Sequence, residues 1–309
     1  MRKPPSPTEC SQYPIVTGTA ALAIGVTLAW WGRVDVSPLL EDAHLRAGEL
    51  WRLITSILPH VSVYHLAFNV YWLWVFGTLL EREWGHARTV GLIILFAAGS
   101  GAAEYTFLEG GVGLSGVGYG LFGLLWVLSR KDGRFSDAVD QQTTLLFFGW
   151  FVLCIVLTVT DMYRVANFAH GVGALLGVMV GVAATARQRV KPFAWAATVA
   201  TVLLCVVAAI FLRPYLNFSK NAAMDEEQMG YAALTGNRNA EAVRWLKDAT
   251  RMNPHEARSW YNLAIAYDRT GDTTAATRAF GKAAAIAPEH STYKATFENR
   301  AFRQLEKPR

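Results

Sequence analysis

The sequence predicts an all-α protein, in which a polytopic membrane helical bundle is followed by a small soluble helical domain. Of its 309 residues, 52% are hydrophobic, above the roughly 45–50% typical of soluble domains. The apolar residues gather in seven blocks, at about 15–31, 63–80, 89–105, 115–129, 144–160, 166–186 and 192–212. Each block is close to the roughly 17–25 residues that a helix needs to cross a bilayer. Because lipid offers the backbone no hydrogen-bond partners, we expect every block to be helical.

The positive charges beside these blocks indicate how the chain is inserted. With the N-terminus inside, ten Lys or Arg residues lie on the inner side and four in the short outer loops: Arg2, Lys3, Arg82, Arg88, Arg130, Lys131, Arg134, Arg187, Arg189 and Lys191 against Arg33, Arg46, Arg52 and Arg164. This bias predicts a cytoplasmic N-terminus, and seven crossings put the C-terminal domain outside. The first block ends in TLAWWGR without a small-residue cleavage site, so we expect an uncleaved anchor. No basic patch with interleaved aromatics suggests nucleic acid.

A few polar residues interrupt the apolar blocks: His65, Asn69, Glu104, Ser115 and His170. Such residues are costly in hydrocarbon and are candidates for function. Each also has a simpler interpretation. A single membrane histidine often only bonds a neighbouring helix, and a serine among glycines often only allows close helix packing.

The order of the blocks favours a shared site. His65, Ser115 and His170 each lie near the start of an even-numbered block, and all even-numbered blocks begin on the outer side of the membrane. Asn69 and Tyr119 lie four residues after His65 and Ser115, on the same helix faces. A hydroxyl, two imidazoles and an amide at one depth supply a nucleophile, a base and oxyanion donors for acyl transfer.

Other motifs are not supported. GVGLSG fits the dinucleotide pattern G-x-G-x-x-G only formally, because no strand precedes it. Val117 breaks the nucleophile-elbow pattern G-x-S-x-G. The chain has no H-E-x-x-H and no Cys/His cluster, so a metalloprotease is unsupported.

Several motifs, in order along about 50–177, resemble the rhomboid family of intramembrane serine proteases. G-x-S-G is present as GLSG at 113–116, H-x-x-x-x-H-x-x-x-N as HVSVYHLAFN at 60–69, and A-H-x-x-G-x-x-x-G as AHGVGALLG at 169–177. The family's Trp-Arg pair is present as Trp51-Arg52, and Glu81 and Gly85 match the end of its second helix. Together these motifs are very specific.

The resemblance implies a role for each position. Ser115 would be the nucleophile and His170 the general base, and His65, Asn69 and the Ser115 N–H would form the oxyanion hole. Supporting residues would be Tyr119, Gly113, Gly116, Trp51 and Arg52, with Tyr119 packing on His170 and the Trp-Arg pair ordering the first outer loop. Family resemblance also places the fifth span, with Phe147, Phe148, Trp150 and Phe151, beside the lateral route of the substrate.

Glycine spacing explains how the fourth and sixth spans approach each other. Gly116 and Gly120 would pack against Gly173, Gly177 and Gly181, which brings His170 to Ser115. Gly111 and Gly113 would let the preceding loop return below the membrane surface. We expect Glu104 to be a solvated interface residue and His60 to order the loop.

Residues 257–290 match the 34-residue tetratricopeptide pattern at eight positions: Trp260, Leu263, Ala264, Tyr267, Ala276, Phe280, Ala283 and Pro288. A weaker repeat precedes it, with Met229, Gly230, Ala233, Ala242, Leu246, Ala249 and Pro254. Its turn glycine, Gly236, is displaced by one residue from the position that corresponds to Gly271. A final helix at about 291–305 would cap the pair. Because arrays usually need three repeats, the domain would lean on the membrane domain, a second copy or a partner.

These observations predict four segments: a cytoplasmic tail (1–14), a six-helix rhomboid catalytic core (15–190), an extra transmembrane helix (191–216) and an extracytoplasmic tetratricopeptide domain (217–309). We expect an integral multi-pass protein of a bacterial plasma membrane. It would be a serine endopeptidase that cleaves transmembrane or membrane-proximal segments, with the tetratricopeptide domain holding a protein or peptide ligand. No metal or other cofactor is implied.

Two alternatives remain open. One is a non-catalytic rhomboid-like protein that binds membrane clients, although such proteins usually lack the serine or the histidine. The other is a membrane-anchored scaffold that acts through its repeats alone. For the tetratricopeptide domain by itself, the alternative to ligand binding is a stable, inert appendage. A transporter is least favoured, because no inverted repeat is visible.

Overall fold

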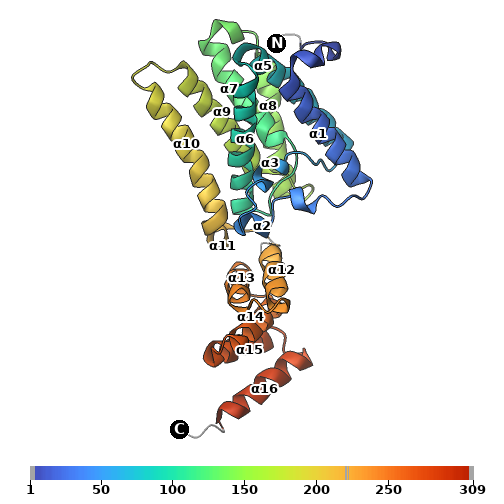
Figure 1. Ribbon diagram of the computed structural model, residues 1–309, viewed down its shortest axis with the longest axis vertical. Helices are drawn as coiled ribbons and strands as arrows, with labels where there is room; N and C mark the ends of the chain where they lie inside the picture. The colour runs from blue at the N-terminus through green and yellow to red at the C-terminus, as the bar shows by residue number, and fades with distance from the viewer. Residues whose placement is uncertain (1–3, 220, 222, 306–309) are drawn as a thin grey trace. The chain divides into compact units, whose positions relative to one another are not determined.

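The structure is a computed structural model that describes residues 4–219, 221 and 223–305. All regular structure among these residues is helical (Figure 1), as the sequence predicts. The chain divides into two compact units, Met1–Arg213 and Pro214–Arg309. Long apolar helices make up the first unit, and shorter amphipathic helices make up the second.

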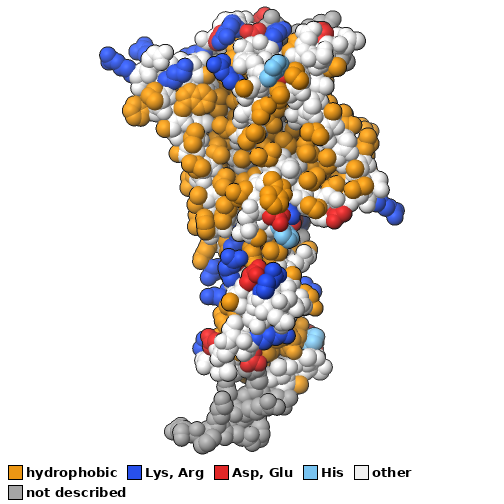
Figure 2. Space-filling model, in the orientation of Figure 1, with side chains coloured by type: hydrophobic (Ala, Val, Ile, Leu, Met, Phe, Trp, Pro, Cys, Tyr) orange, Lys and Arg blue, Asp and Glu red, His pale blue; other side chains and the backbone are white. Residues whose placement is uncertain are grey.

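Six stretches of the described residues are long and apolar enough to cross a membrane. They are α1 (Pro14–Trp31), Val63–Trp84, α6 (His86–Phe107), α8 (Gln141–Val159), α9 (Asn167–Thr185) and Lys191–Leu216. Val63–Trp84 consists of α4 (Val63–Trp72), a π-helical turn (Leu73–Gly77) and α5 (Thr78–Trp84). Lys191–Leu216 consists of α10 (Lys191–Val207), a second π-helical turn (Ala208–Leu212) and α11 (Arg213–Leu216). Figure 2 shows hydrophobic side chains covering the middle of these helices. The protein is therefore an integral membrane protein.

The fourth predicted block forms α7 (Ser115–Lys131), which has 17 residues. At this length it lies at the lower limit for a membrane crossing, so its crossing stays a prediction. Eleven of its residues are buried, and it packs against α6 and α9. The helix that begins with the candidate nucleophile is therefore at the centre of the bundle.

Glycines bring α7 and α9 into backbone contact. A methyl group at Gly173 would overlap the Gly116 carbonyl oxygen, and one at Gly177 would overlap the Gly120 carbonyl oxygen. A methyl group at Gly181 would lie 2.7 Å from Cβ of Val127. The predicted glycine-mediated approach of the two helices is confirmed.

A buried carboxylate caps the first membrane helix. Glu81, at the end of the second span, accepts hydrogen bonds from the Ile15 N–H (2.9 Å) and the Val16 N–H (3.0 Å). His86 lies 2.7 Å from the same carboxylate. These two amides belong to the first turn of α1, where backbone donors have no partner within the helix. Glu81 therefore joins α1 to the α5–α6 turn.

We expect Glu81→Ala to lower the free energy of unfolding by about 1–3 kcal/mol, because it leaves buried backbone donors without an acceptor. Thermal unfolding of the full chain in detergent would measure this loss. Glu83→Ala is the matched control, since Glu83 forms only a partly exposed ion pair with Arg82. Equal losses in the two variants would contradict the capping role.

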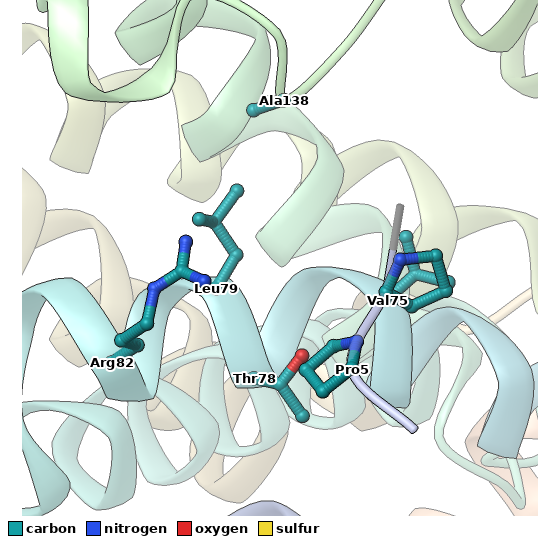
Figure 3. Close-up of a pocket in the computed structure, with 7 residues that line it drawn as sticks. Pro5, Val75, Thr78, Leu79, Arg82 and Ala138 are labelled. Carbon is teal, nitrogen blue, oxygen red and sulfur yellow. The ribbon is translucent and has the colours of Figure 1, made fainter. Parts of the chain in front are cut away.

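The segment between α1 and α4 lies against the bundle and contains two short helices, α2 (Ala43–Arg46) and α3 (Arg52–Thr55). A shallow pocket lies elsewhere, between the N-terminal segment and the end of the second span (Figure 3). It is lined by Pro4, Pro5, Val75, Thr78, Leu79, Arg82 and Ala138. Arg82 is 17 residues after His65, about 25 Å along the helix. This pocket is therefore not part of the candidate site.

The second unit contains α12 (Met224–Thr235), α13 (Asn239–Met252), α14 (Ala257–Arg269), α15 (Thr273–Ile286) and α16 (Ser291–Leu305). The first four helices pack as consecutive pairs, α12 with α13 and α14 with α15. Most of the predicted repeat residues lie in its buried core, among them Ala233, Ala242, Leu246, Ala249, Leu263, Ala264, Ala276, Phe280 and Ala283. Arg258 of α14 forms an ion pair with Glu227 of α12, which links the two repeats.

The displaced turn glycine has a structural explanation. Gly271 ends the first half of the second repeat with φ +87°, and Asn237, 34 residues earlier, has φ +59°. Asparagine tolerates this left-handed conformation better than most residues. Asn237 therefore takes the position of the turn glycine. Gly236 is the residue before it and has φ −81°.

Candidate active site

The loop before Ser115 is held by the segment that precedes α4. The Gly113 N–H donates to the Ser56 carbonyl (3.0 Å), and the Leu114 N–H donates to His60 Nε2 (3.2 Å). Gly113 has φ +98°, and a side chain there would also meet the His65 ring at 2.6 Å. Only glycine suits this position, which brings the loop close to His65.

His60 can accept the Leu114 N–H because of its tautomer. Its Nδ1 lies 2.9 Å from the Leu58 carbonyl oxygen, so Nδ1 carries the proton and Nε2 is free to accept. Burial, together with the neighbouring His65, lowers the pKa of His60 to about 4. The ring is therefore neutral near pH 7, and it orders the loop in the way the sequence predicts.

Ser115 and His170 are brought into direct contact. Ser115 is the first residue of α7 and His170 lies in the first turns of α9, and His170 Nε2 is 2.8 Å from Ser115 Oγ. His170 is 3% exposed, and its Nδ1 has no hydrogen-bond partner in the described part of the chain. A hydroxyl and an imidazole at this distance form a nucleophile–base pair without a third carboxylate.

Tyr119 fixes the plane of the His170 ring. The two rings stack with centroids 4.6 Å apart and an interplanar angle of 25°. The Tyr119 hydroxyl donates to the Phe147 carbonyl of α8 at 3.1 Å. Tyr119 therefore links the candidate base to α8.

His65 and Asn69 lie one turn apart on α4. Among the described residues, His65 Nδ1 and Asn69 Nδ2 are buried without a hydrogen-bond partner. Buried polar groups usually have partners, so these two nitrogens are available to a bound molecule. The structure brings His65 beside Gly113, whereas no hydrogen bond joins the Asn69 Nδ2 to Ser115 in the described part of the chain.

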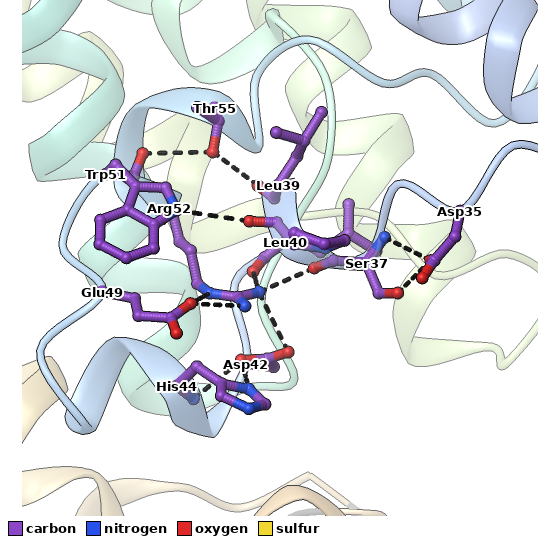
Figure 4. Close-up of polar contacts among 11 residues, drawn as sticks. Asp35, Ser37, Leu39, Leu40, Asp42, His44, Glu49, Trp51, Arg52 and Thr55 are labelled. Atoms are coloured by element: carbon purple, nitrogen blue, oxygen red, sulfur yellow. Dashed lines mark hydrogen bonds and ion pairs between the residues drawn. The ribbon is translucent and has the colours of Figure 1, made fainter.

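Trp51 and Arg52 lie at the start of α3, in the segment between α1 and α4 (Figure 4). The Arg52 side chain is buried and donates to the Ser37 carbonyl (2.7 Å), the Leu40 carbonyl (2.8 Å) and the carboxylates of Asp42 and Glu49. Trp51 is 52% exposed, and its indole N–H donates weakly to the Pro38 carbonyl at 3.4 Å. Arg52 thus ties the loop together, while Trp51 lies mostly on its surface.

The sequence model of the rhomboid domain matches residues 47–187, and that of the tetratricopeptide repeat matches residues 257–290. Residues 47–187 are a rhomboid domain. It contains Ser115, His170, Tyr119, His65 and Asn69, and the tetratricopeptide repeat follows in the second unit.

Two similar relatives are the rhomboid protease GlpG of Enterobacter sp. (strain 638) and that of Salmonella paratyphi A. Each is 31% identical over 144 residues, which cover 46% of this chain and 51% of the relative. The chain thus spans about half the length of these curated relatives.

Two buried carboxylates lie beside the site: Glu104 differs from the sequence expectation, and Glu41 is one that the sequence analysis does not single out. Glu104 is 2% exposed, not solvated, and accepts a hydrogen bond from the Ala169 N–H at 3.0 Å. Glu41 is 6% exposed and bonds the loop before Ser115. The expectation of a snorkelling Glu104 was wrong because α9 offers it backbone donors. Glu41 lies outside the apolar blocks, where a carboxylate gives no signal.

Proposed function

We propose that the protein is an intramembrane serine endopeptidase that cleaves transmembrane or membrane-proximal segments of other proteins. The observation that carries this proposal is the 2.8 Å contact between Ser115 Oγ and His170 Nε2, at the start of two helices within an apolar bundle. The rhomboid domain and its protease relatives support the same reaction class.

In the proposed reaction, Ser115 Oγ attacks the carbonyl carbon of the scissile bond while its proton passes to His170 Nε2. The carbon–oxygen bond forms, and the carbonyl oxygen becomes an oxyanion. When the intermediate collapses, the carbon–nitrogen bond breaks, and the leaving amine takes the proton from His170. A water molecule then attacks the acyl-enzyme, again through His170, and restores the Ser115 hydroxyl.

The oxyanion would be held by the Ser115 N–H, His65 and Asn69. Ser115 begins α7, and the first amides of a helix have no intrahelical acceptor. The unpartnered nitrogens of His65 and Asn69 support this assignment. Such donors contribute strongly where water is excluded, roughly 10²–10³-fold in kcat for one donor in soluble proteases.

The substrate would reach Ser115 between α4 and α8. Phe68 of α4 stacks on Trp150 of α8 with centroids 5.3 Å apart, and only Thr143, Phe147 and Cys154 are buried among the residues of α8. A helix with few buried side chains can move more easily than its neighbours. A transmembrane segment in the bilayer would therefore enter by separating this aromatic pair.

The C-terminal unit would bind a protein or peptide segment on the concave surface typical of such repeats. In the topology that the charge bias predicts, it lies on the same extracytoplasmic side as Ser115. It would recruit or select substrates there. A scaffold without catalysis is the second candidate, and deletion of 221–309 would then abolish function while Ser115→Ala would not.

The decisive experiment reconstitutes the full chain in proteoliposomes with a single-span reporter whose helix is locally destabilised. We expect cleavage by the wild type, none by Ser115→Ala, and a fluorophosphonate adduct on Ser115 detected by mass spectrometry. Cleavage that persists in Ser115→Ala would refute the protease. Reporter binding without cleavage or adduct would favour the non-catalytic alternative.

Tyr119 provides a finer test of the base. Tyr119→Phe keeps the ring on His170 and should change kcat less than threefold, because only the bond to the Phe147 carbonyl is lost. Tyr119→Leu removes the stacking, which contributes about 0.5–1.5 kcal/mol, so kcat should fall roughly 2- to 10-fold. The rate of reporter cleavage per folded molecule measures the change in kcat for both variants. A larger effect from Tyr119→Phe would contradict the orienting role of the ring.

A further inference from the structure

The helix that carries His170 has no cap of its own. Ala166 precedes α9 and offers no side-chain acceptor, yet the first turn of any helix leaves backbone donors free. In this bundle the acceptor comes from α6, since Glu104 accepts from the Ala169 N–H at 3.0 Å and also from the Phe168 N–H. A carboxylate at a helix N-terminus is also favoured by the helix dipole. Glu104 therefore caps α9 in the turn that contains His170.

The loop that leads to Ser115 has a comparable support. Glu41 accepts from the Gly111 N–H at 3.2 Å through one oxygen and from the Ser56 hydroxyl at 3.1 Å through the other. Gly110, with φ +95°, lies against the Glu41 backbone, and a methyl group at Gly101 of α6 would overlap the Glu41 carboxylate. The glycines on both sides make room for this side chain. Glu41 thus fixes the loop four residues before Ser115.

We propose that Glu41 and Glu104 are positioning residues of the dyad, with Glu41 holding the loop of Ser115 and Glu104 holding the helix of His170. This inference rests on the proposed protease function. Within the described part of the chain, the hydrogen-bond partners of the two carboxylates are Ser56, Gly111 and the first turn of α9, and not the side chains of Ser115 or His170. Neither is therefore a catalytic residue. Each carboxylate holds a backbone segment that carries one of the two residues in the 2.8 Å contact between Ser115 Oγ and His170 Nε2.

Misplacement of one partner has a large effect on rate. A shift of about 1 Å away from the reactive geometry can reduce the rate roughly 10²-fold. The dyad also lacks a carboxylate on His170 Nδ1, so the position of α9 must come from packing and from its cap. Loss of either support should therefore slow the attack by Ser115 more than it weakens substrate binding.

Glu41 gives this arrangement a pH dependence. Burial raises the pKa of Glu41 from 4.5 to about 8, with the facing Glu104 adding to the rise and Arg213 of α11 opposing it. The folded state therefore retains a proton that the unfolded state loses, so stability falls as pH rises from about 4.5 to about 8 and then levels off. Above pH 8, an ionised Glu41 faces Glu104 in a buried site, and we expect the loop to loosen and kcat to fall.

The experiment uses the full chain and four variants, Glu104→Leu, Glu104→Gln, Glu41→Leu and Glu41→Gln. The rate of Ser115 labelling by a fluorophosphonate reports the dyad without a protein substrate, and reporter cleavage gives kcat and KM. We expect both Leu variants to lower labelling and kcat at least tenfold per folded molecule, with KM changed less than threefold. Glu104→Gln, which keeps one acceptor, should be about threefold slower.

Glu41→Gln separates the positioning role from a general loss of stability. At pH 7 it should stay within twofold of the wild type, because the amide can still bond Gly111 and Ser56. Between pH 7 and pH 9 it should lack the fall in kcat that the wild type shows. This comparison still tests the role of Glu41 if a Leu variant fails to fold. A fall in kcat between pH 7 and pH 9 that is as large in Glu41→Gln as in the wild type would overturn that role.

Glu109→Gln is the matched control, because Glu109 lies in the same loop but forms an exposed ion pair with Arg164. It should stay within twofold of the wild type. Variants at Glu104 that unfold at lower temperature yet label at the wild-type rate per folded molecule would overturn the proposal. If instead the wild type neither labels nor cleaves, the protease function itself fails, which is a separate outcome.

Discussion

Removing either half of the dyad, by Ser115→Ala or His170→Ala, is expected to lower kcat for reporter cleavage by roughly 10⁴-fold or more. Without the hydroxyl there is no nucleophile to form the acyl-enzyme. Without the imidazole, Nε2 can no longer take the Ser115 proton at 2.8 Å. Once one of the two residues is removed, the other contributes little to catalysis, because the two side chains act on the same proton.

The double variant should therefore lose no more activity than either single variant. Single-turnover cleavage in proteoliposomes measures all three, and KM should change less than threefold. His44→Ala is a suitable control and should stay within twofold, because His44 lies in α2 with 46% of its side chain exposed. Losses that add in the double variant would show that Ser115 and His170 act independently.

The resemblance to the rhomboid family implies the pairing of Ser115 with His170, and two physical features of the sequence support it. Polar residues in the apolar blocks are few, so each is a candidate for function. The alternating direction of the blocks across the membrane places three of them at the same depth. Glycine spacing then identifies the two helices that can approach closely, and the structure has both features, with Gly173 against Gly116 and Gly177 against Gly120.

The supports of the site could not be predicted in the same way. Glu41 and Gly111 are separated by 70 positions, and Glu104 and Ala169 by 65, and no local pattern connects an acceptor with a backbone donor so far away. The missing cap of α9 is visible in the sequence as Ala166. However, the residue that replaces it depends on which helix lies alongside. The π-helical turns at Leu73–Gly77 and Ala208–Leu212 likewise give no periodic signal.

Gly177→Ala is the second variant with a large expected effect, although it lies two turns away from the chemistry. Its new methyl group would overlap the Gly120 carbonyl oxygen and lie 2.8 Å from the Leu124 nitrogen. Backbone atoms cannot move aside as a side chain can, so α9 must separate from α7. Overpacking of this kind costs about 1–3 kcal/mol, and thermal unfolding of the full chain should detect it.

The effect on rate should exceed the effect on stability, because His170, Gly173 and Gly177 share the face of α9 that meets α7. A shift of the helix at Gly177 carries His170 away from Ser115, and we expect kcat per folded molecule to fall roughly 10- to 100-fold. Gly91→Ala is the matched control, because a methyl group there meets nothing within 4 Å, and it should leave kcat within twofold. If Gly177→Ala lowers stability but leaves kcat unchanged, the approach of α7 and α9 does not set the dyad distance.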